Sequence, residues 1–441
     1  MSGLRQSMGL VHATAMVVGI ILGASIFIQP SEITRLVPST RGVLLVWLAA
    51  GVLTLCGALV CAELSAVFPS TGGVYVFLKE IFTPALGFLW GWGMFWSMHS
   101  GIIAAIAVVM GRYPGYFIPL SEWGVRGIAI ATVLLLSVIN YLGVKPGSAV
   151  QVVLTSAKVV AIGILVIVLF GFGGAAHRAA AAGVVASSGT SIRNYLLAIG
   201  AGLFAYGGWH MVTYAAGETR QAARTLPRAL MAGTVVVTAC YMLLNGAYVY
   251  VMPLRQLAES HRVASDAAER TLVVGTGGLI SLLVIISAIG ALNGIILAGP
   301  RVYYAMANDG LAFRWMGAVD ARRQTPSLAI AAQAVWSCLL VATNSYRELF
   351  TRVVYTEWLF FAVLAAGLFV LRRRTGWRPR YLGWAFPLAP LLFIVASLGI
   401  AINQLAVNPR DSVMGLGLLL LGIPVYFVSA KARENRKNAH H

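Results

Sequence analysis

Small and flexible residues gather at the centre of the first long apolar run, within residues 19–27 (GIILGASIF). The run extends over about residues 10–33, which is long enough to cross a bilayer as one helix. Gly23 disfavours helix and the next two residues add no bulk, so we expect the helix to break here. A break frees backbone N–H and C=O groups, which membranes tolerate only against protein or a water-filled cavity. The second half-helix begins near Ile26, and its N-terminus would favour a bound carboxylate.

A second interrupted run matches the first. Residues 202–209 (GLFAYGGW) lie inside another spanning run, about residues 192–217, and again bring glycines to its centre. Two interrupted helices, one in each half of a chain, indicate the binding site of a membrane transporter. Phe204 and Tyr206 flank this break, so one of the two rings could close over a bound solute. His210 follows directly and is expected to face the cavity, as a packing residue or as a proton sensor.

Lys158 is the one Lys or Arg of the sequence that lies deep in a spanning run. Its span begins near Ser148, which puts Lys158 about 15 Å along a helix and too far from the end for easy snorkelling. A charge at that depth is costly, so a functional role is expected. We expect its ammonium group to bind carbonyls exposed by the first break and so to do the work of a sodium ion.

Three glutamates lie near the ends of spanning runs. Glu63 and Glu218 are near ends expected on the inner side, where two interpretations are open. Each could anchor loop backbone or an arginine, or each could act in gating. Glu357 lies near the outer start of the tenth run, where it could be solvated.

Other interpretations of the first stretch stay open. Small residues at this spacing let helices approach closely, so packing alone would also produce the pattern. Ser25 together with His99 or His210 would suit an intramembrane serine hydrolase, although the sequence supplies no third group to orient the base. A channel is a further alternative, but no ring of repeated polar side chains is present in the sequence.

The composition is that of an integral membrane protein. Of 441 residues, 59% are hydrophobic and 10% are charged, whereas about a quarter are charged in a soluble domain. The net charge of +18 lies in short loops between spans, so topology explains it better than nucleic-acid binding does. The cysteines, which are Cys56, Cys61, Cys240 and Cys338, fall in apolar runs without a CxxC pattern. We therefore expect no disulfide framework, no metal site and no cofactor.

Apolar runs separated by loop signals predict an all-α integral membrane protein with about twelve spanning helices. Their approximate bounds are 10–34, 42–67, 84–112, 125–142, 148–172, 192–218, 228–252, 275–305, 326–343, 353–371, 383–405 and 412–430. Each broken run opens a set of five spans, and the two sets run in opposite directions, which is the plan of a 5+5 inverted repeat. We therefore expect a first repeat over residues 1–172, a second over 192–371, two additional helices over 383–430 and a tail over 431–441.

Basic residues favour one orientation of these spans. With the N-terminus inside, the inside segments hold more Lys and Arg than the outside ones, and the cluster Arg372–Arg374 lies inside. We therefore expect a multi-pass protein of the cytoplasmic membrane with both termini in the cytoplasm. The outside loop 253–274 would form a surface helix that acts as an outer lid. The inside loop 68–83 would form a short interfacial helix, and the segment 220–228 a polar hinge.

Four stretches of the sequence resemble the amino acid–polyamine–organocation (APC) transporter superfamily, most closely its L-type amino acid transporter branch and the bacterial relatives of that branch. They are residues 23–27 (GASIF), 204–209 (FAYGGW), 291–294 with 301–310 (ALNG, RVYYAMANDG), and 62–64 with 68–73 (AEL, FPSTGG). Together these stretches cover roughly residues 15–310 in the order and spacing of the family. The resemblance implies a LeuT-type fold with broken helices 1 and 6, sodium-independent transport and often obligatory exchange.

The resemblance also implies roles for single residues. The substrate-binding positions would be Ile21, Ala24, Ser25, Ile26, Phe204, Gly207 and His210. The N–H groups of residues 24–26 would hold the substrate carboxylate. Carbonyls of Ile21, Phe204 and Gly207 would hold the substrate ammonium, and the Phe204 ring would form the outer gate. Lys158 would be the lysine of span 5 that lies beside span 1. His210 stands where relatives often have an asparagine near the substrate side chain.

This sequence departs from the family in its first break and in one loop. The usual break reads Gly-Ser/Ala-Gly, whereas Ser25 stands at the third position here. Its β-carbon narrows the approach to the carboxylate, although its hydroxyl could donate a hydrogen bond. Eukaryotic light chains of the branch join a single-span glycoprotein through a cysteine between spans 3 and 4. The corresponding loop, about Tyr113 to Gly124, has no cysteine, so we predict function without such a subunit.

We predict a transporter, not an enzyme, that carries small or neutral L-amino acids by alternating access and works as an exchanger. Its partners would be the amino acid substrate and membrane lipid. Two alternatives within transporters are proton-coupled symport and an amine or polyamine substrate. A polyamine would require acidic groups in the cavity, for which Glu218 and Glu357 are the candidates.

Overall fold

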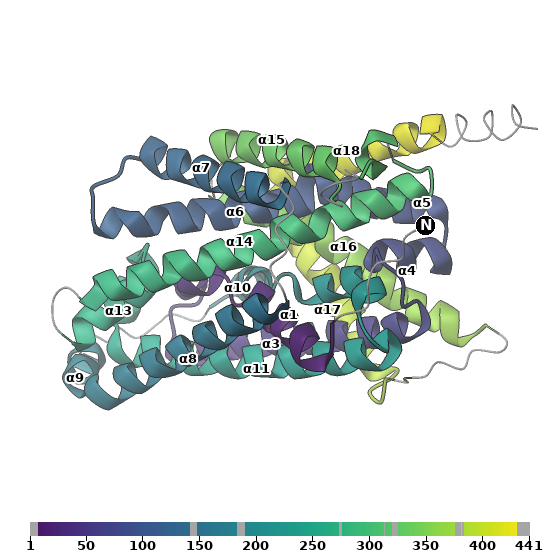
Figure 1. Cartoon of the computed structure of the whole chain (residues 1–441). Coiled ribbons are helices and arrows are strands. Elements are labelled where there is room, and N and C mark those ends of the chain that lie inside the picture. The colour runs from purple at the N-terminus through teal and green to yellow at the C-terminus, as the bar shows by residue number, and fades with distance from the viewer. Residues whose placement is uncertain are drawn as a thin grey trace, which may run out of the picture.

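The structure is a computed structural model that describes residues 8–141, 148–182, 190–272, 276–312, 314–319, 325–344, 346–374, 381 and 383–429 (Figure 1). Its regular elements are helices, and the extended pairing in these ranges is one isolated bridge between Met8 and Thr219. The predicted all-α class is therefore confirmed. The predicted tail, residues 431–441, lies outside the described residues.

The helices of the described ranges follow one another with short connections. In chain order they are α1 (Leu10–Ile21), η1 (Ala24–Phe27), α2 (Gln29–Leu36), α3 (Thr40–Val67), α4 (Val74–Ile81), α5 (Pro84–Gly93), η2 (Met94–Met98), α6 (His99–Arg112), η3 (Tyr113–Tyr116), α7 (Glu122–Tyr141), α8 (Ser148–Phe172), α9 (Gly174–Ala182), α10 (Ile192–Ala205), η4 (Trp209–Glu218), α11 (Ala222–Val251), α12 (Leu254–Glu259), α13 (Val263–Thr271), α14 (Thr276–Asn308), η5 (Arg314–Gly317), α15 (Ser327–Thr343), α16 (Tyr346–Arg372), α17 (Leu388–Val407) and α18 (Pro409–Leu420). Four of the η segments are 3₁₀ helices, and η2 is a π-helical turn.

Ten helical segments of the described chain are long and apolar enough to cross a membrane. They are Thr40–Val67, Pro84–Tyr116, Glu122–Tyr141, Thr155–Phe172, Ile192–Gly217, Ala222–Val251, Thr276–Asn308, Tyr355–Arg372, Leu388–Val407 and Pro409–Ser429. Two shorter apolar helices, α1 and α15, bring the total to the twelve spans that the sequence predicts. The chain is therefore a multi-pass membrane protein of LeuT type, and each of its halves opens with a broken helix.

Helices also extend beyond the apolar runs that reveal them. α11 begins at Ala222 and α16 begins at Tyr346, both earlier than their runs, because charged residues in their first turns lower the local hydropathy. The segment 220–228, predicted as a polar hinge, is helical from Ala222 onward after a left-handed residue at Gln221. The loop 253–274 contains the short helices α12 and α13, and α4 forms the short helix predicted between spans 2 and 3.

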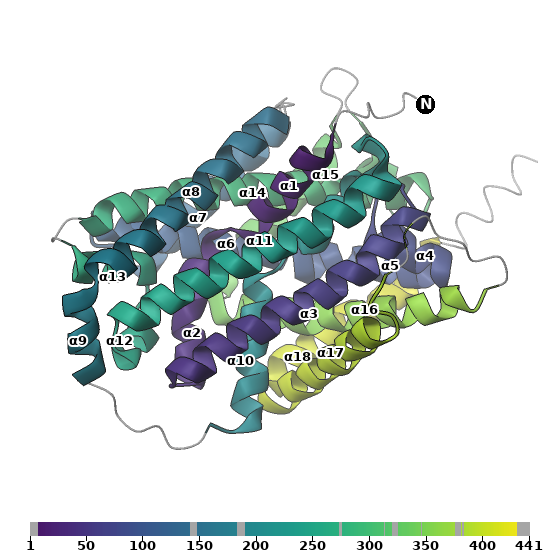
Figure 2. The ribbon, with the colours of Figure 1, turned by 90° about the horizontal axis from the view of Figure 1, so that it is seen from below.

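The spanning helices form two packed groups, and the two breaks lie where these groups meet. In one group α3 and α11 run side by side, and α1 and α8 pack against α11 (Figure 2). In the other, α6, α7, α14 and α15 pack against one another (Figure 1). α14 also contacts α1, η1 and η4. Both breaks therefore lie against the second group. The division into repeats over residues 1–172 and 192–371 stays a prediction.

Burial separates the centre of the molecule from its membrane-facing surface. The segment Pro84–Tyr116 is 94% buried in its most apolar window, whereas the corresponding windows of α7 and α8 are 28% buried. The exposed sides of α7, α8 and α17 carry large apolar residues such as Leu135, Ile167 and Ile402. Such surfaces suit contact with lipid. The span of α5, η2 and α6 is therefore a central support for whatever site the breaks form.

Candidate functional site

The first broken helix ends two residues before the glycine that the sequence singles out. α1 ends at Ile21, Leu22 has ψ 64°, and Gly23 is extended with ψ −160°, so the helix does not continue. A single 3₁₀ turn, η1, follows, and α2 resumes at Gln29. Leu22 N–H still donates to the Val18 carbonyl at 2.8 Å, and Gly23 N–H donates to the Ile21 carbonyl at 2.7 Å. The predicted break is therefore confirmed.

The second broken helix approaches the first closely. α10 ends at Ala205, and Gly207 N–H donates to the Phe204 carbonyl at 2.9 Å. Gly208 has φ +91°, which a residue with a β-carbon rarely adopts. A β-carbon there would also lie 2.4 Å from Cγ2 of Ile20, so glycine is required by conformation and by space. The contact brings the two breaks side by side.

A small cavity lies between the breaks. Its volume is about 10 Å³, which is roughly the room that one water needs. It is lined by Ile20, Ile21, Gly23, Ser25, Ile102, Ile106, Phe204, Ala205, Gly207, Gly208, Met211 and Ile295. The polar groups in this lining are the hydroxyl of Ser25 and the backbone of the residues around the two breaks. The isoleucines of α6 and α14 and Met211 of η4 supply apolar walls.

Four of the predicted substrate positions line this cavity, namely Ile21, Ser25, Phe204 and Gly207. Ile26 is fully buried but does not line it. The backbone of Ala24 begins the η1 turn, and its side chain lies outside the described part. His210 points elsewhere, as described below. The walls from α6, including Ile102, were not found from the sequence, because nothing in their apolar run distinguishes a cavity wall from ordinary packing.

The ammonium group of Lys158 reaches the end of the first half-helix. Lys158 is 8% exposed, and its Nζ donates to the Gly19 carbonyl at 3.3 Å. One turn earlier, the Thr155 hydroxyl donates to the Ala15 carbonyl at 3.0 Å. The last four carbonyls of a helix have no partner within it, and Gly19 belongs to that turn. The contact predicted between Lys158 and the first break is therefore present.

Tyr241 of α11 joins the two breaks and was not predicted. Its hydroxyl lies 2.8 Å from the Ile21 carbonyl and 3.0 Å from the Ala205 carbonyl. A phenol has one proton to donate, so these two carbonyls share it. Tyr241 is fully buried and is surrounded edge-on by Trp47 and Tyr206. No spacing in the sequence distinguishes this tyrosine from a packing residue of a spanning helix.

His210 faces away from the cavity and toward α16. Its Nε2 lies 3.7 Å from Oε1 of Glu357, and both side chains are buried. The prediction that Glu357 is solvated is wrong, since it is 6% exposed. The reason is that α16 begins at Tyr346, so Glu357 lies about three turns inside the helix and not at its start.

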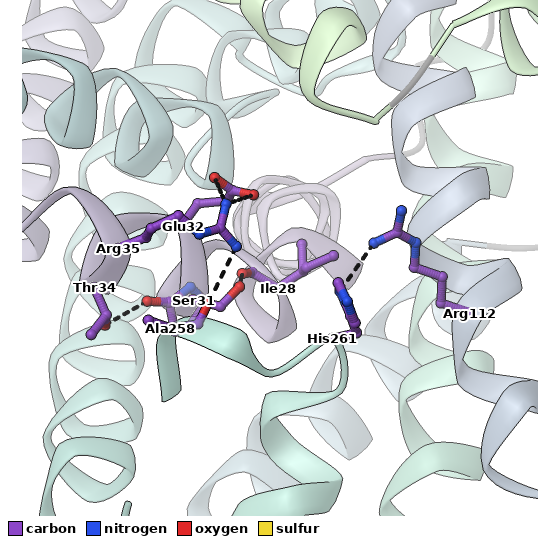
Figure 3. Close-up of polar contacts among 9 residues, drawn as sticks. Ile28, Ser31, Glu32, Thr34, Arg35, Arg112, Ala258 and His261 are labelled. Carbon is purple, nitrogen blue, oxygen red and sulfur yellow. Dashed lines mark hydrogen bonds and ion pairs between the residues drawn. The ribbon is translucent and has the colours of Figure 1, made fainter. Parts of the chain in front are cut away.

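One end of the molecule, which we call the lid end, carries α2 and the short helices α12 and α13. α12 packs on α2, and the Arg35 guanidinium at the end of α2 donates to the Ala258 carbonyl of α12 at 3.1 Å (Figure 3). Arg35 also pairs with Glu32 at 2.9 Å. Beside them, Nη1 of Arg112 lies 3.5 Å from Nδ1 of His261 (Figure 3). The bond between Arg35 and Ala258 joins α12 to the first broken helix, and the contact between Arg112 and His261 joins the segment after α12 to α6.

Ion pairs also close the opposite end. Arg372 donates to both carboxylate oxygens of Glu63, at 2.9 and 2.6 Å, and Gly383 N–H donates to the same carboxylate at 2.8 Å. Lys79 of α4 donates to Asp309 at 2.9 Å. Of the two interpretations of Glu63, these contacts match the anchoring of an arginine and of loop backbone.

The geometry gives no support to a serine hydrolase. Within the described residues, no hydrogen bond joins Ser25 to His99 or His210. His99 instead places Nε2 2.7 Å from the Ile295 carbonyl, and His210 faces Glu357. The same residues contain no group of three His, Cys, Asp or Glu side chains that could hold a metal ion. The cavity therefore offers backbone polar groups and apolar walls, which suit reversible binding of a solute.

Spanning helices, two of them broken beside a central cavity, define a membrane transporter. A family model described as "Amino acid permease" matches residues 8–428, which is nearly the whole chain. The protein therefore belongs to the amino acid permease family, in the APC superfamily that the sequence motifs resemble.

Named relatives agree with this assignment. The serine/threonine exchanger SteT of Bacillus subtilis is 31% identical over 98% of this chain and 99% of its own. The human b(0,+)-type amino acid transporter 1 is 30% identical over 84% of this chain and 77% of its own. The rat large neutral amino acids transporter small subunit 2 is 30% identical over 96% of this chain and 81% of its own. The family and these relatives are transporters, and amino acid transport is their common activity.

Proposed function

We propose that this protein is a sodium-independent exchanger of small neutral L-amino acids that works by alternating access. The observation that carries the proposal is the cavity of about 10 Å³ between the two breaks, with backbone polar groups beside apolar walls. A zwitterion needs both N–H donors and carbonyl acceptors. A short apolar side chain needs walls without charge. The names of SteT and of the b(0,+)-type relative support an amino acid as the solute.

In this proposal the substrate lies between η1 and the end of α10. The N–H groups of residues 24–26 open a helical turn, where they lack partners within the turn, and would hold the carboxylate. The carbonyls of Ile21, Phe204 and Gly207 would hold the ammonium group. The Ile21 carbonyl already accepts from Gly23 N–H and from the Tyr241 hydroxyl, and the Phe204 carbonyl accepts from Gly207 N–H, so the ammonium group would take the place of the hydroxyl at Ile21.

The size of the cavity supports a small substrate. An amino acid requires more room than the cavity holds in this conformation, so binding must move its walls. Phe204 is the largest side chain of the lining and would act as the gate ring. Ser25 adds a β-carbon beside the proposed carboxylate position. It therefore leaves less room than a glycine would for a substrate with a long side chain. His210 lies two residues after Gly208 of the lining and would affect the substrate through that backbone.

Lys158 supports independence from sodium. Its ammonium group holds the Gly19 carbonyl at the end of the first half-helix. A bound cation would otherwise be needed to neutralise carbonyls released by a break at membrane depth. A covalently attached cation keeps this position occupied throughout the cycle, so sodium would have no site to fill here.

Alternating access would move the two broken helices with α3 and α11 against the group of α6, α7, α14 and α15. The lid end would then face the exterior and the opposite end the cytoplasm. The basic cluster Arg372–Arg374 at the opposite end supports this orientation in the cytoplasmic membrane. The loop Tyr113 to Gly124 contains no cysteine, so we propose that the chain acts without a disulfide-linked glycoprotein.

The test is uptake of labelled L-amino acids into proteoliposomes that contain this chain alone, in sodium-free buffer. Vesicles are loaded with unlabelled amino acid or left empty, with and without a pH gradient. We expect uptake of label only into loaded vesicles, with L-serine or L-alanine exchanged faster than L-tryptophan or putrescine. Accumulation in empty vesicles driven by acid outside would show a proton symporter instead, and no uptake of any amino acid would contradict the proposal.

Removing the hydroxyl of Tyr241 should slow exchange. Tyr241→Phe leaves the Ile21 and Ala205 carbonyls without their shared donor, and one lost hydrogen bond costs about 0.5–1.5 kcal/mol. We expect the exchange rate to fall roughly 3- to 10-fold in the proteoliposome assay. Tyr248→Phe is the matched control, since Tyr248 is buried on the same helix and its hydroxyl has no hydrogen-bond partner in the described chain. Equal rates for both variants would remove Tyr241 from the site.

Removing Arg35 should loosen the lid. Arg35→Ala deletes the bond to the Ala258 carbonyl, and we expect amide hydrogen exchange in α12 to accelerate about fivefold, since a bond of about 1 kcal/mol is lost. Arg255→Ala is the control, because Arg255 pairs within α12, with Glu259 at 3.4 Å, and its side chain is 90% exposed. If Arg35→Ala exchanged no faster than Arg255→Ala, the contact would not hold the lid.

A further inference from the structure

The pair of His210 and Glu357 lies in the membrane interior outside the substrate cavity. The imidazole is 1% exposed and the carboxyl group 6% exposed, and 3.7 Å separates their nearest atoms. Neither ring nitrogen of His210 has a hydrogen-bond partner in the described part of the chain. The pair is therefore an acid and a base with no hydrogen-bond partner for the imidazole among the described residues, and the two groups lie so close that a proton bound to one affects the charge of the other.

Aromatic rings enclose the imidazole. The rings of Trp90, Trp209, Tyr214 and Phe361 have centroids 5.8, 5.4, 5.6 and 5.0 Å from that of His210. Such an enclosure excludes water, so a net charge inside it is costly. With one proton between them, the acid and base have no net charge. A second proton, or none, leaves a whole charge in the enclosure and weakens the contact.

Other titratable groups reach this enclosure from every side. His99 of α6 interacts electrostatically with His210, and its Nδ1 also has no hydrogen-bond partner among the described residues. Tyr214 interacts with Glu357, and further with Tyr303 of α14 and Cys61 of α3. Near pH 7 the phenol and thiol groups are neutral. His99 is itself an imidazole, so the charge of the enclosure is set by the protons on His210, Glu357 and His99, and a pH-dependent step that belongs to His99 would persist in the variants of the pair.

The two members of the pair lie on different helices. His210 lies at the start of η4, two residues after Gly208 of the cavity lining, while Glu357 lies on α16, which packs on α6 and η2 and also contacts α10 and α3. Motion of the broken helices would separate the imidazole from the carboxyl group. We propose that His210 and Glu357 form a proton-binding latch, so that the protonation of this pair controls the movement of η4 away from α16. The latch rests on the proposed alternating access, but the proton site does not.

The proton site is tested by tryptophan fluorescence of the purified full-length protein between pH 5 and 9. Trp90 and Trp209 lie against His210, and a charged imidazole quenches a neighbouring indole. We expect one pH-dependent step in the unaltered protein that is lost in His210→Asn and lost in Glu357→Gln. The controls are His177→Asn and Glu259→Gln, an exposed histidine and an exposed glutamate remote from these indoles, and both should keep the step.

Persistence of the step in either His210→Asn or Glu357→Gln, or its absence from the unaltered protein, would overturn the proposal. Glu357→Leu provides a second variant if the glutamine fails to fold, because an apolar group of similar size leaves no unpaired amide. This measurement requires no transport activity, so it stands even if the proposed substrate class is wrong.

The latch is tested by the rate of serine exchange at equal pH on both sides of the vesicle. We expect the rate to change across the same pH range as the fluorescence, and this dependence to be lost in both single variants. The double variant should show no further change, because the two groups act as one unit. A fluorescence step with an exchange rate that ignores pH would overturn the latch.

Discussion

Replacing Ser25 with tryptophan should abolish amino acid exchange while the protein still folds. Ser25 is 4% exposed and lines a cavity of about 10 Å³, whereas an indole buries about 150–250 Å² of surface. The ring would fill the space between the breaks and exclude any carboxylate from η1. Even extra methylenes in a packed core cost about 1–3 kcal/mol, so the indole must displace the walls of the cavity, and folding of the variant has to be measured. We expect uptake into loaded vesicles to equal that of protein-free vesicles.

The matched variant is Ser25→Gly, which removes the β-carbon at the same position. It should retain exchange and accept larger neutral amino acids, because the approach to η1 widens. Size-exclusion chromatography and thermal unfolding would show that both variants are folded. Exchange by a folded Ser25→Trp protein at the rate of the unaltered protein would place the substrate elsewhere.

Replacing Lys158 with alanine should lower the exchange rate about 10- to 100-fold. The Gly19 carbonyl then loses its charged donor at membrane depth, and hydrogen bonds to charged groups contribute about 1.5–3 kcal/mol, where each 1.4 kcal/mol is tenfold in rate. Lys158 does not line the pocket, so substrate should still bind. The rate is measured in loaded vesicles and the binding by substrate-induced thermal stabilisation.

Thr155→Val is the control for this effect. Thr155 donates to the Ala15 carbonyl from the same side of α8, one turn away from Lys158. Ala15 lies inside α1, where its carbonyl has an intrahelical partner, so the loss should be small. Similar losses in both variants would indicate general packing of α8 on α1. Unchanged kinetics in Lys158→Ala would remove the fixed cation from the mechanism.

Breaks and buried charges are the features of this site that the sequence reveals. Gly23 and Gly208 interrupt apolar runs where nothing but a helix would otherwise form, so the broken helices could be located to within a few residues. Lys158 could be identified from the sequence because a cation deep in a span is costly and therefore indicates a functional role. Its contact with the first break followed from the depth of each residue in its helix.

Contacts that depend on which face a side chain occupies could not be predicted in this way. Tyr241 and Ile102 are ordinary members of apolar runs, and only the packing of α11 and α6 aims them at the breaks. Glu357 was misplaced because the charged first turns of α16 lower the hydropathy and hide the true start of the helix. His210 was expected at the cavity, yet its ring points to α16, a direction set by the irregular turn of η4.

The short bridge between Met8 and Thr219 has a mechanical consequence. Arg220 N–H donates to the Met8 carbonyl at 2.9 Å, which fastens the beginning of α1 to the end of η4. In the proposed alternating access, neither broken helix would move at that end without carrying the other or breaking this bond. The link would therefore couple the movements of the two broken helices.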